Sequence, residues 1–240
     1  MILETKKLWF KKAQVFLEEK LPDVKKLEEK YDFISLISHT KLDLPGWGLK
    51  EKDTALIDLT LPEEEIFKKF SDTTRNEIRK TYNNPDLNFE LNQDFEKSYS
   101  LYSQFEKYQD RKPMAKKEMT SFKSALVFCK GDPIYGFYII ESLPYSRIRS
   151  IFSKRLSIED KDMIKIISNS GRRLLWEICK DLKNREFVFL DMASVNQSNP
   201  KSANIAKFKM SFGGKIVREY AYIYKSAAFK FFEKIRNKIL

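Results

Sequence analysis

The sequence has very few of the residues that build metal sites and disulfide frameworks. Its 240 residues include two cysteines, Cys129 and Cys179, and one histidine, His39. None of them has a second Cys or His at metal-ligand spacing, so we expect no metal site. Both cysteines are expected to be small buried side chains. We expect His39 to be a structural or surface residue.

Glycine and proline are also scarce, with 7 and 8 residues, which excludes a collagen-like or low-complexity chain. No Gly-x-Gly-x-x-Gly or phosphate-loop motif supports nucleotide binding of those kinds. There is no run of about 18 apolar residues that could span a bilayer, and residues 1–7 lack the apolar segment of a secretory signal. We therefore expect a cytoplasmic protein.

Positive charge is abundant. There are 45 Lys and Arg residues against 34 Asp and Glu residues, which gives a formal net charge of +11. Such a charge favours anionic partners: nucleic acid, a phosphate-rich cofactor or an anionic membrane surface. The alternative is a set of solvated lysine-rich faces, because acidic residues are interspersed along most of the chain. A hydrophobic content of 42% indicates a folded globular domain in either case.

The order of the expected elements is mixed. An N-terminal helical extension is expected over residues 1–30, with the helix at about 4–30, and one domain over 31–240. Residues 125–130, 134–141 and 147–153 are typical of an antiparallel meander. Further strands are expected at 33–38, 54–60, 87–91, 187–190 and 215–224. Further helices are expected to open at Pro62 and to span 73–82, 95–108, 118–124, 170–182, 204–212 and 227–239. This pattern predicts an α/β (α+β) fold with a mixed, largely antiparallel twisted sheet flanked by helices.

Three segments, in order, resemble the GNAT superfamily of N-acyltransferases, and within it the branch of Fem-type aminoacyltransferases and their shorter acetyltransferase relatives. They are Thr73–Lys80, the span from Arg147 through Asp191, and the sequence Phe-Lys-Met-Ser-Phe-Gly-Gly at 208–214. The resemblance implies a GNAT-like domain over 31–240. It also implies transfer of an acyl group, such as acetyl, from acyl-CoA to a primary amine of a sugar, peptide or cell-envelope precursor. The amine would attack directly, without a covalent enzyme intermediate.

The donor site is expected at the start of the helix that begins near Ser170. A helix N-terminus with a capping Ser suits a pyrophosphate, Gly171 permits close approach, and Arg172 and Arg173 can pair with phosphate oxygens. The alternative is an ordinary capped helix with exposed arginines. The Gly-rich pyrophosphate loop of most GNAT enzymes is reduced here to residues 169–172.

Three residues are candidates for catalysis. Asp191 ends an apolar strand, where it could orient an amine or accept its proton, or simply cap a turn. Lys209 could place a cation near a phosphate or a developing oxyanion, or be a surface lysine. Tyr138 is a candidate general acid, one of several tyrosines near sheet ends among which the sequence does not choose. Arg75, Arg79, Asn196 and Asn199 are candidate substrate-binding residues, each with a solvated-surface alternative.

Two other functions compete with acyl-CoA-dependent transfer. One is a Fem-type transferase that takes its donor from aminoacyl-tRNA and acts on a peptidoglycan precursor, for which the net charge is the best argument. The other is a non-enzymatic module that binds nucleic acid or a membrane surface. The basic, apolar helix at 227–239 could lie on the inner membrane face or pack on the domain.

Overall fold

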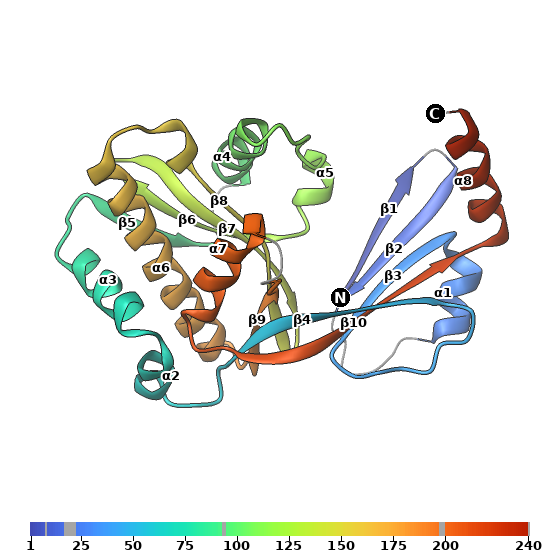
Figure 1. Cartoon of the computed structure of the whole chain (residues 1–240), viewed down its shortest axis with the longest axis horizontal. Coiled ribbons are helices and arrows are strands. Elements are labelled where there is room, and N and C mark those ends of the chain that lie inside the picture. The colour runs from blue at the N-terminus through green and yellow to red at the C-terminus, as the bar shows by residue number, and fades with distance from the viewer. Residues whose placement is uncertain (8, 17–22, 93–94, 197–199, 240) are drawn as a thin grey trace.

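A single ten-stranded sheet joins the two lobes of this protein (Figure 1). The computed structural model describes residues 1–240 except 8, 17–22, 93–94, 197–199 and 240. The smaller lobe contains β1 (Ile2–Lys7), β2 (Phe10–Phe16), α1 (Val24–Lys30), β3 (Phe33–Ser38) and α8 (Ala227–Ile239). The strand order in the sheet is β1-β2-β3-β10-β4-β9-β8-β7-β6-β5.

Two long strands, β4 (Gly48–Asp58) and β10 (Lys215–Lys225), pair antiparallel and run from the small lobe into the large one. The large lobe contains the remaining elements: α2 (Glu63–Lys69), α3 (Asp72–Tyr82), β5 (Leu87–Leu91), α4 (Phe95–Tyr108), α5 (Lys116–Met119), β6 (Lys123–Cys129), β7 (Asp132–Ser142), β8 (Tyr145–Ser153), the 3-10 helix η1 (Lys154–Ser157), α6 (Lys161–Asn184), β9 (Phe189–Ser194) and α7 (Pro200–Met210).

The sheet is largely antiparallel, as the sequence predicts. Only the β2–β3 and β8–β9 pairs are parallel among the described strands. The main core lies between the sheet and α6, where Leu174, Leu175 and Ile178 pack against strand residues such as Phe137 and Leu190. A second core lies on the opposite face under α4, around Tyr102, Tyr138 and Phe152.

The prediction of a helix is wrong for the first half of the N-terminal segment. Residues 2–7 and 10–16 form a β-hairpin, and among the residues described up to residue 30 only 24–30 are helical. In β2 the buried residues Ala13 and Val15 are two positions apart, which is the period of a strand. In the sequence, Leu8, Val15, Phe16 and Leu17 suggest a loose helical face, but the pairing of β2 with β3 decides the conformation of residues 10–16.

The start of the central helix also differs from expectation. Helix α6 begins at Lys161, not near Ser170, and its N-cap is Asp160. The Asp160 carboxylate accepts hydrogen bonds from the backbone N–H groups of Asp162 and Met163. The polar residues at 160–170 therefore belong to the first turns of one long helix.

Candidate active site

Strands β8 and β9 pair over only three rungs and then part. The paired residues are Tyr145 with Phe189, Ser146 with Leu190, and Arg147 with Asp191. Strand β8 continues to Ser153 and β9 to Ser194, but no further rung joins them in the described part of the chain. Beyond Arg147, the backbone of β8 on this side is therefore without a strand partner.

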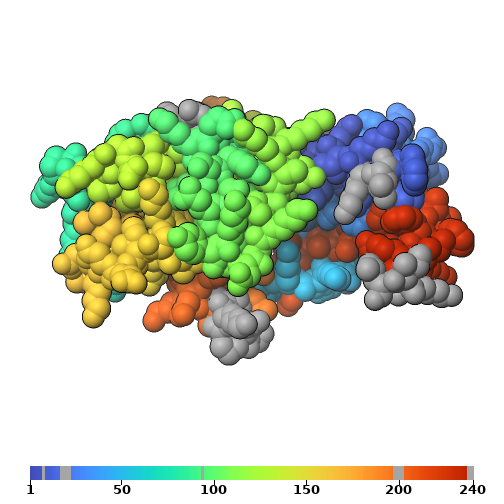
Figure 2. Space-filling model, turned by 90° about the horizontal axis from the view of Figure 1, so that it is seen from above, coloured from blue at the N-terminus to red at the C-terminus, as the bar shows by residue number. Residues whose placement is uncertain are grey.

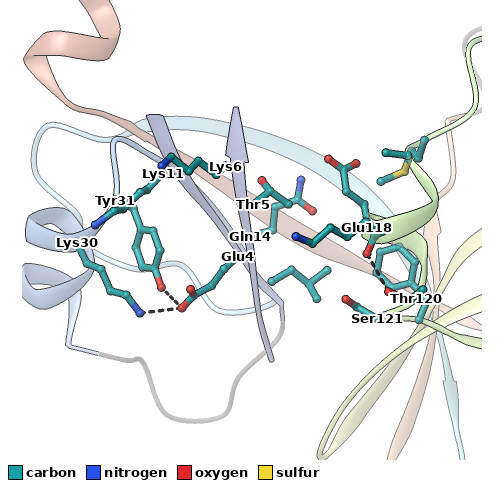
Figure 3. Close-up of a pocket in the computed structure, with 15 residues that line it drawn as sticks. Glu4, Thr5, Lys6, Lys11, Gln14, Lys30, Tyr31, Glu118, Thr120 and Ser121 are labelled. Atoms are coloured by element: carbon teal, nitrogen blue, oxygen red, sulfur yellow. Dashed lines mark hydrogen bonds and ion pairs between the residues drawn. The ribbon is translucent and has the colours of Figure 1, made fainter. Parts of the chain in front are cut away.

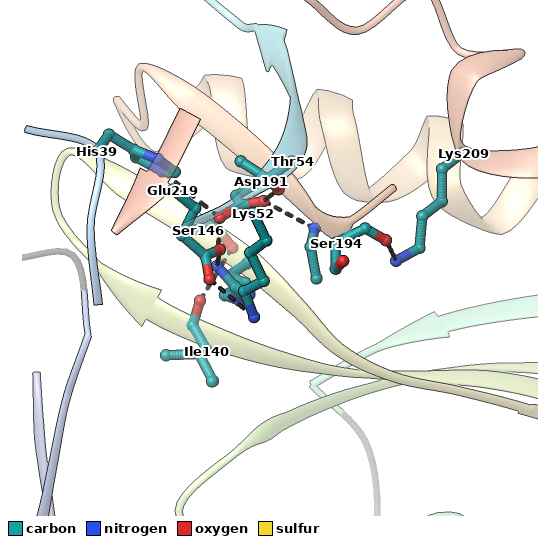
Figure 4. A network of polar contacts seen from close by, with 11 residues as sticks. His39, Lys52, Thr54, Ile140, Ser146, Asp191, Ser194, Lys209 and Glu219 are labelled. Atoms are coloured by element: carbon teal, nitrogen blue, oxygen red, sulfur yellow. Dashed lines mark hydrogen bonds and ion pairs between the residues drawn. The ribbon is translucent and has the colours of Figure 1, made fainter. Parts of the chain in front are cut away.

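A cluster of buried charges lies at the last rung, Arg147 with Asp191 (Figure 4). The Arg147 Nη1 atom is 2.6 Å from Asp191 Oδ2 and 2.5 Å from Glu219 Oε2. Lys52 Nζ lies 2.8 Å from the other carboxylate oxygen of Glu219. The side chains of Asp191 and Glu219 have no solvent exposure, so their negative charges depend on these partners.

Both oxygens of the Asp191 carboxylate have polar partners. Its Oδ1 atom accepts hydrogen bonds from the Thr54 hydroxyl and from the Ala193 N–H, the latter at 2.7 Å. His39 Nε2 lies 3.5 Å from Oδ2. Burial raises the pKa of Asp191, but the positive charge of Arg147 and the hydrogen bonds lower it overall, so the group is ionised. Asp191 is therefore a poor proton acceptor, and its geometry suits the positioning of its neighbours.

Lys209 reaches the same region from α7. It is 8% exposed, and its Nζ donates a hydrogen bond of 2.9 Å to the carbonyl oxygen of Ser194 at the end of β9. Burial, followed by the positive charge of Arg147, lowers the pKa of Lys209 to about 8. About one tenth of such lysines are neutral at pH 7, compared with a far smaller fraction for an ordinary lysine.

The backbone of β9 is unusual at this point. Ala193 has a φ of 59°, a left-handed conformation that costs about 1–2 kcal/mol for a residue with a Cβ. This conformation turns the Ala193 N–H toward Asp191, and the pairing register between β4 and β9 shifts between Thr54 and Leu56. Such stored strain is typical of functional sites.

The structure brings two of the three candidate catalytic residues together. Asp191 belongs to the buried charge cluster, and the charges of Arg147 and Asp191 both affect the pKa of Lys209. Tyr138 lies elsewhere, fully buried under α4, where its hydroxyl is 3.1 Å from the hydroxyl of Ser98. Burial raises the pKa of Tyr138 to about 12. Its observed role is in packing.

The predicted donor site is not at a helix N-terminus, because Ser170 and Gly171 lie in the middle of α6. The Ser170 hydroxyl donates to the carbonyl of Ile167, and a Cβ on Gly171 would lie 2.5 Å from the Tyr135 ring. Arg172 pairs with Glu77, and Arg173 with Glu177. The expectation that these residues cap the helix toward a pyrophosphate is therefore wrong.

These α6 residues also lie on the other face of the sheet from Asp191. Leu190 and Met192, the neighbours of Asp191 in β9, belong to the core under α6. Because successive strand residues point to opposite faces, Asp191 points away from α6. The sheet separates the two groups of residues that the sequence had combined in one site.

The remaining predicted residues are dispersed. Arg75 pairs with Asp72 and donates to the carbonyl of Lys68, and Arg79 donates to Asn76, all within the α2–α3 region. Asn196 is exposed two residues after β9. Asn199 lies outside the described residues.

Sequence reasoning missed Lys52, Thr54, His39, Glu219 and the partner role of Arg147. A signal existed for Arg147 and Glu219, because each is a charged residue inside an expected strand, and a buried strand charge needs a partner. Lys52 gave no signal, since β4 begins at Gly48 and not at residue 54. His39 is 10% exposed next to Asp191, whereas a structural or surface position was expected.

A separate groove of about 860 Å³ lies where the two lobes face each other (Figure 3). Strands β1 and β2 form one wall, and the segment around α5 forms the other. Lysines come from both walls, Lys6 and Lys11 from one and Lys117 from the other, whereas Glu4 is engaged by Lys30 and Tyr31. A molecule bound there would contact both lobes.

Within the described ranges, no group of three or more His, Cys, Asp or Glu side chains could hold a metal ion. No described helix is both long enough and apolar enough to cross a bilayer.

Comparison with known proteins gives matches at the level of structure. No family model and no curated relative matches the sequence. FemX superposes with a TM-score of 0.67 and 11% identity, over 96% of this chain and 85% of its own. The C-terminal domain of a putative lysylphosphatidylglycerol synthetase from Agrobacterium fabrum gives 0.58 and 13%, over 95% and 81%. L-PGS from Bacillus licheniformis gives 0.55 and 13%, over 94% and 81%.

These likenesses extend over almost the whole chain and over more than four fifths of each neighbour. They agree with the mixed, mostly antiparallel sheet flanked by helices. The predicted fold is therefore confirmed: the chain has the GNAT-like fold of FemX and the lysylphosphatidylglycerol synthetase domain.

Proposed function

We propose that this protein is an N-acyltransferase whose reaction takes place where β8 and β9 part. The observation that carries the proposal is the buried Arg147–Asp191–Glu219 cluster at the last shared rung, together with Lys209 beside it. The unpaired edge of β8 offers backbone groups that can hold a donor carbonyl, and the cluster fixes the charges around it.

In the proposed reaction, the nitrogen of a primary amine attacks the donor carbonyl directly. A C–N bond forms, the bond from the carbonyl carbon to the carrier oxygen or sulfur breaks, and the carrier leaves as the alkoxide or thiolate that is then protonated. Lys209, in its neutral form, accepts the proton that the amine loses and can pass it to the leaving carrier. Asp191 stays ionised and, through Arg147, Thr54 and the Ala193 N–H, positions the groups around the reacting atoms.

The donor class is the finer part of the proposal. Acyl-CoA is the donor implied by the GNAT resemblance, but the N-terminus of α6 does not favour binding of the CoA pyrophosphate. The Asp160 carboxylate already binds the first free N–H groups of α6, and Asp162 adds a second negative charge in the first turn. An aminoacyl ester carried on tRNA needs no such site, and the net charge of +11 favours it.

The acceptor is proposed to be an amine of a cell-envelope precursor. The neighbours support the cell-envelope class of acceptor, since one of them is named for the synthesis of the lipid lysylphosphatidylglycerol and another is FemX, whereas the amine is what the GNAT resemblance implies. The groove with lysines on both walls is a candidate place for the anionic part of such an acceptor.

The test combines donor binding and transfer. Calorimetric titrations with acetyl-CoA and with aminoacyl-tRNA, at low and high salt, identify the donor. Transfer to a panel of amine-bearing precursors is then followed by mass spectrometry of the new amide. Lys209→Met is expected to lower kcat/KM by about 100-fold or more, while Lys207→Met, an exposed lysine on the same helix, leaves it unchanged. Failure to bind either donor, or full activity of Lys209→Met, would overturn the proposal.

A further inference from the structure

The small lobe carries large apolar side chains that no described residue covers. Trp9, at the tip of the β1–β2 hairpin, is 81% exposed. On α8, Phe231 is 66% exposed and Ile235 is 41% exposed. A lone exposed apolar side chain needs no explanation, but a group that includes a tryptophan and a phenylalanine on adjacent elements is typical of an interaction surface.

The hairpin and α8 lie together at one end of the molecule. The Phe10 ring, next in sequence to Trp9, is 5.2 Å from the ring of Phe229 and 5.1 Å from that of Phe232. Figure 1 shows α8 beside the ends of β1 and β2, and Figure 2 shows the blue hairpin and the red helix sharing the end opposite the large lobe.

Helix α8 has two apolar faces. Phe229 and Phe232 point inward and contact the hairpin. At 100° per residue, Phe231 is about 160° from Phe229 and 100° from Phe232, so it points outward. Ile235 is about 40° from Phe231 and 60° from Phe232, so the two form an outward stripe whose edge at Ile235 borders the inner face. Packing on the domain accounts for the inner face alone.

The surroundings of the outward stripe are basic. Lys234 and Lys230 are exposed on α8, about 60° and 100° from Phe231 around the helix, and Lys11 is exposed on β2, whereas the exposed Arg236 lies on the side of Phe229. The single acidic residue of the helix, Glu233, is held by Lys225 at 2.6 Å. The exposed charge around the stripe is thus positive.

We infer that Trp9, Phe231, Ile235 and these basic residues form a docking surface for an anionic lipid bilayer. A tryptophan at the rim, an apolar stripe and flanking lysines form the combination by which a peripheral helix lies in the headgroup region. A single-stranded polynucleotide could pair with the charges and stack its bases on Trp9 and Phe231, but it gives no reason for the exposed aliphatic side chain of Ile235. The inference stands on this surface alone and does not depend on the proposed acyl transfer.

The surface supplies its own reporter. Trp9 is exposed, whereas Trp176 is buried in the core and Trp47 is partly buried against Tyr224. Vesicles of phosphatidylcholine with about 30% phosphatidylglycerol are expected to shift the tryptophan emission to shorter wavelength. Trp9→Phe should remove the shift yet retain co-sedimentation with the vesicles.

Three variants separate the contributions of the apolar stripe and of the lysines to vesicle binding. Phe231→Ser with Ile235→Ser is expected to weaken vesicle binding by about tenfold or more. Lys230→Gln with Lys234→Gln should weaken binding to the anionic vesicles and reduce its dependence on salt. Leu156→Ser is the matched control, because Leu156 is 53% exposed next to Lys154 and Arg155 on η1, which packs on α4 and α6, and it should bind as the wild type does.

Three results would overturn the inference. The first is equal binding by the serine variants, which would make the stripe irrelevant. The second is tRNA binding that requires Lys230 and Lys234 with no vesicle binding, which would assign the surface to nucleic acid. The third is a stable dimer in light scattering that Phe231→Ser with Ile235→Ser dissociates, which would assign the stripe to a second copy of the chain. Circular dichroism of each variant checks that it is folded.

Discussion

At the scale of single residues, the lowered pKa of Lys209 predicts how the stability of the protein depends on pH, and this prediction can be tested without a substrate. The pKa of Lys209 is lowered to about 8 in the folded protein and returns to about 10.4 on unfolding. Between these values the unfolded state binds more protons, so the stability of the wild type rises with pH. Lys209→Met does not bury a charge on folding, so its free energy of unfolding is expected to exceed that of the wild type. The difference should be as much as about 3 kcal/mol below pH 8 and should disappear by about pH 10.4.

Urea denaturation of both proteins from pH 6 to 10.5 measures this difference. Lys207→Met provides the control, because Lys207 is exposed and its difference from wild type should not change with pH. A flat difference for Lys209→Met would mean that Lys209 has an ordinary pKa, and its role as a base would be lost.

Gly171 gives a second prediction at this scale. A Cβ at this position would lie 2.5 Å from the Tyr135 ring, inside the core under α6. Gly171→Ala is expected to destabilise the protein by about 1–3 kcal/mol through overpacking. Gly48→Ala is the matched control, since its Cβ would meet only a carbonyl oxygen at 3.7 Å. Equal midpoints of thermal unfolding for the two variants would contradict the packing seen around α6.

The sequence identifies individual site residues only where their chemistry is visible locally. Asp191 and Lys209 could be found because one ends an apolar strand and the other lies in a segment that resembles a family motif. Ser170 to Arg173 looked like a helix start because Ser and Gly are typical of caps, whereas the true cap, Asp160, lies a few turns earlier. Arg147, Glu219 and Lys52 meet only through strand pairing, which no local pattern encodes.

At the scale of elements, the distorted end of β9 makes the next prediction. Ala193 has a φ of 59°, so Ala193→Gly relieves strain and is expected to leave stability unchanged or raise it by about 0.5–1 kcal/mol. Ala221→Gly, within the regular pairing of β10 with β3 and β4, should instead cost about 0.5–1 kcal/mol. Denaturant unfolding measures the change in the free energy of unfolding of each variant. Changes of opposite sign would support the strain at Ala193, and a comparable loss of stability in both variants would rule it out.

Elements with strong local signals were predicted to the residue. The strands at 33–38 and 87–91 and the helices at 95–108 and 227–239 have the expected bounds. Prediction failed where tertiary pairing overrides weak local preference, as in the β1–β2 hairpin. It also failed for the first turns of α6, where Met163, Ile166 and Ile167 have helical spacing and contact the core, but the Ser and Gly at 170–171 suggested a later start.

At the scale of the whole molecule, the continuous sheet predicts cooperative unfolding. Trp47 reports on the small lobe, where it packs near Tyr224, and Trp176 reports on the large lobe, where it packs near Phe70. Because β4 and β10 belong to both lobes, Trp47→Phe and wild type should show coincident fluorescence and circular dichroism transitions. Two separated transitions would mean that the lobes fold independently.

The ribbon formed by β4 and β10 has one more consequence. It is the strand pair that runs between the lobes, and Lys52 and Glu219 face each other across it. Glu219 also holds Arg147, which forms the last rung before β8 and β9 part. A path of direct contacts therefore runs from the strands shared by the two lobes, through the Glu219–Arg147 ion pair, to the point where β8 and β9 part.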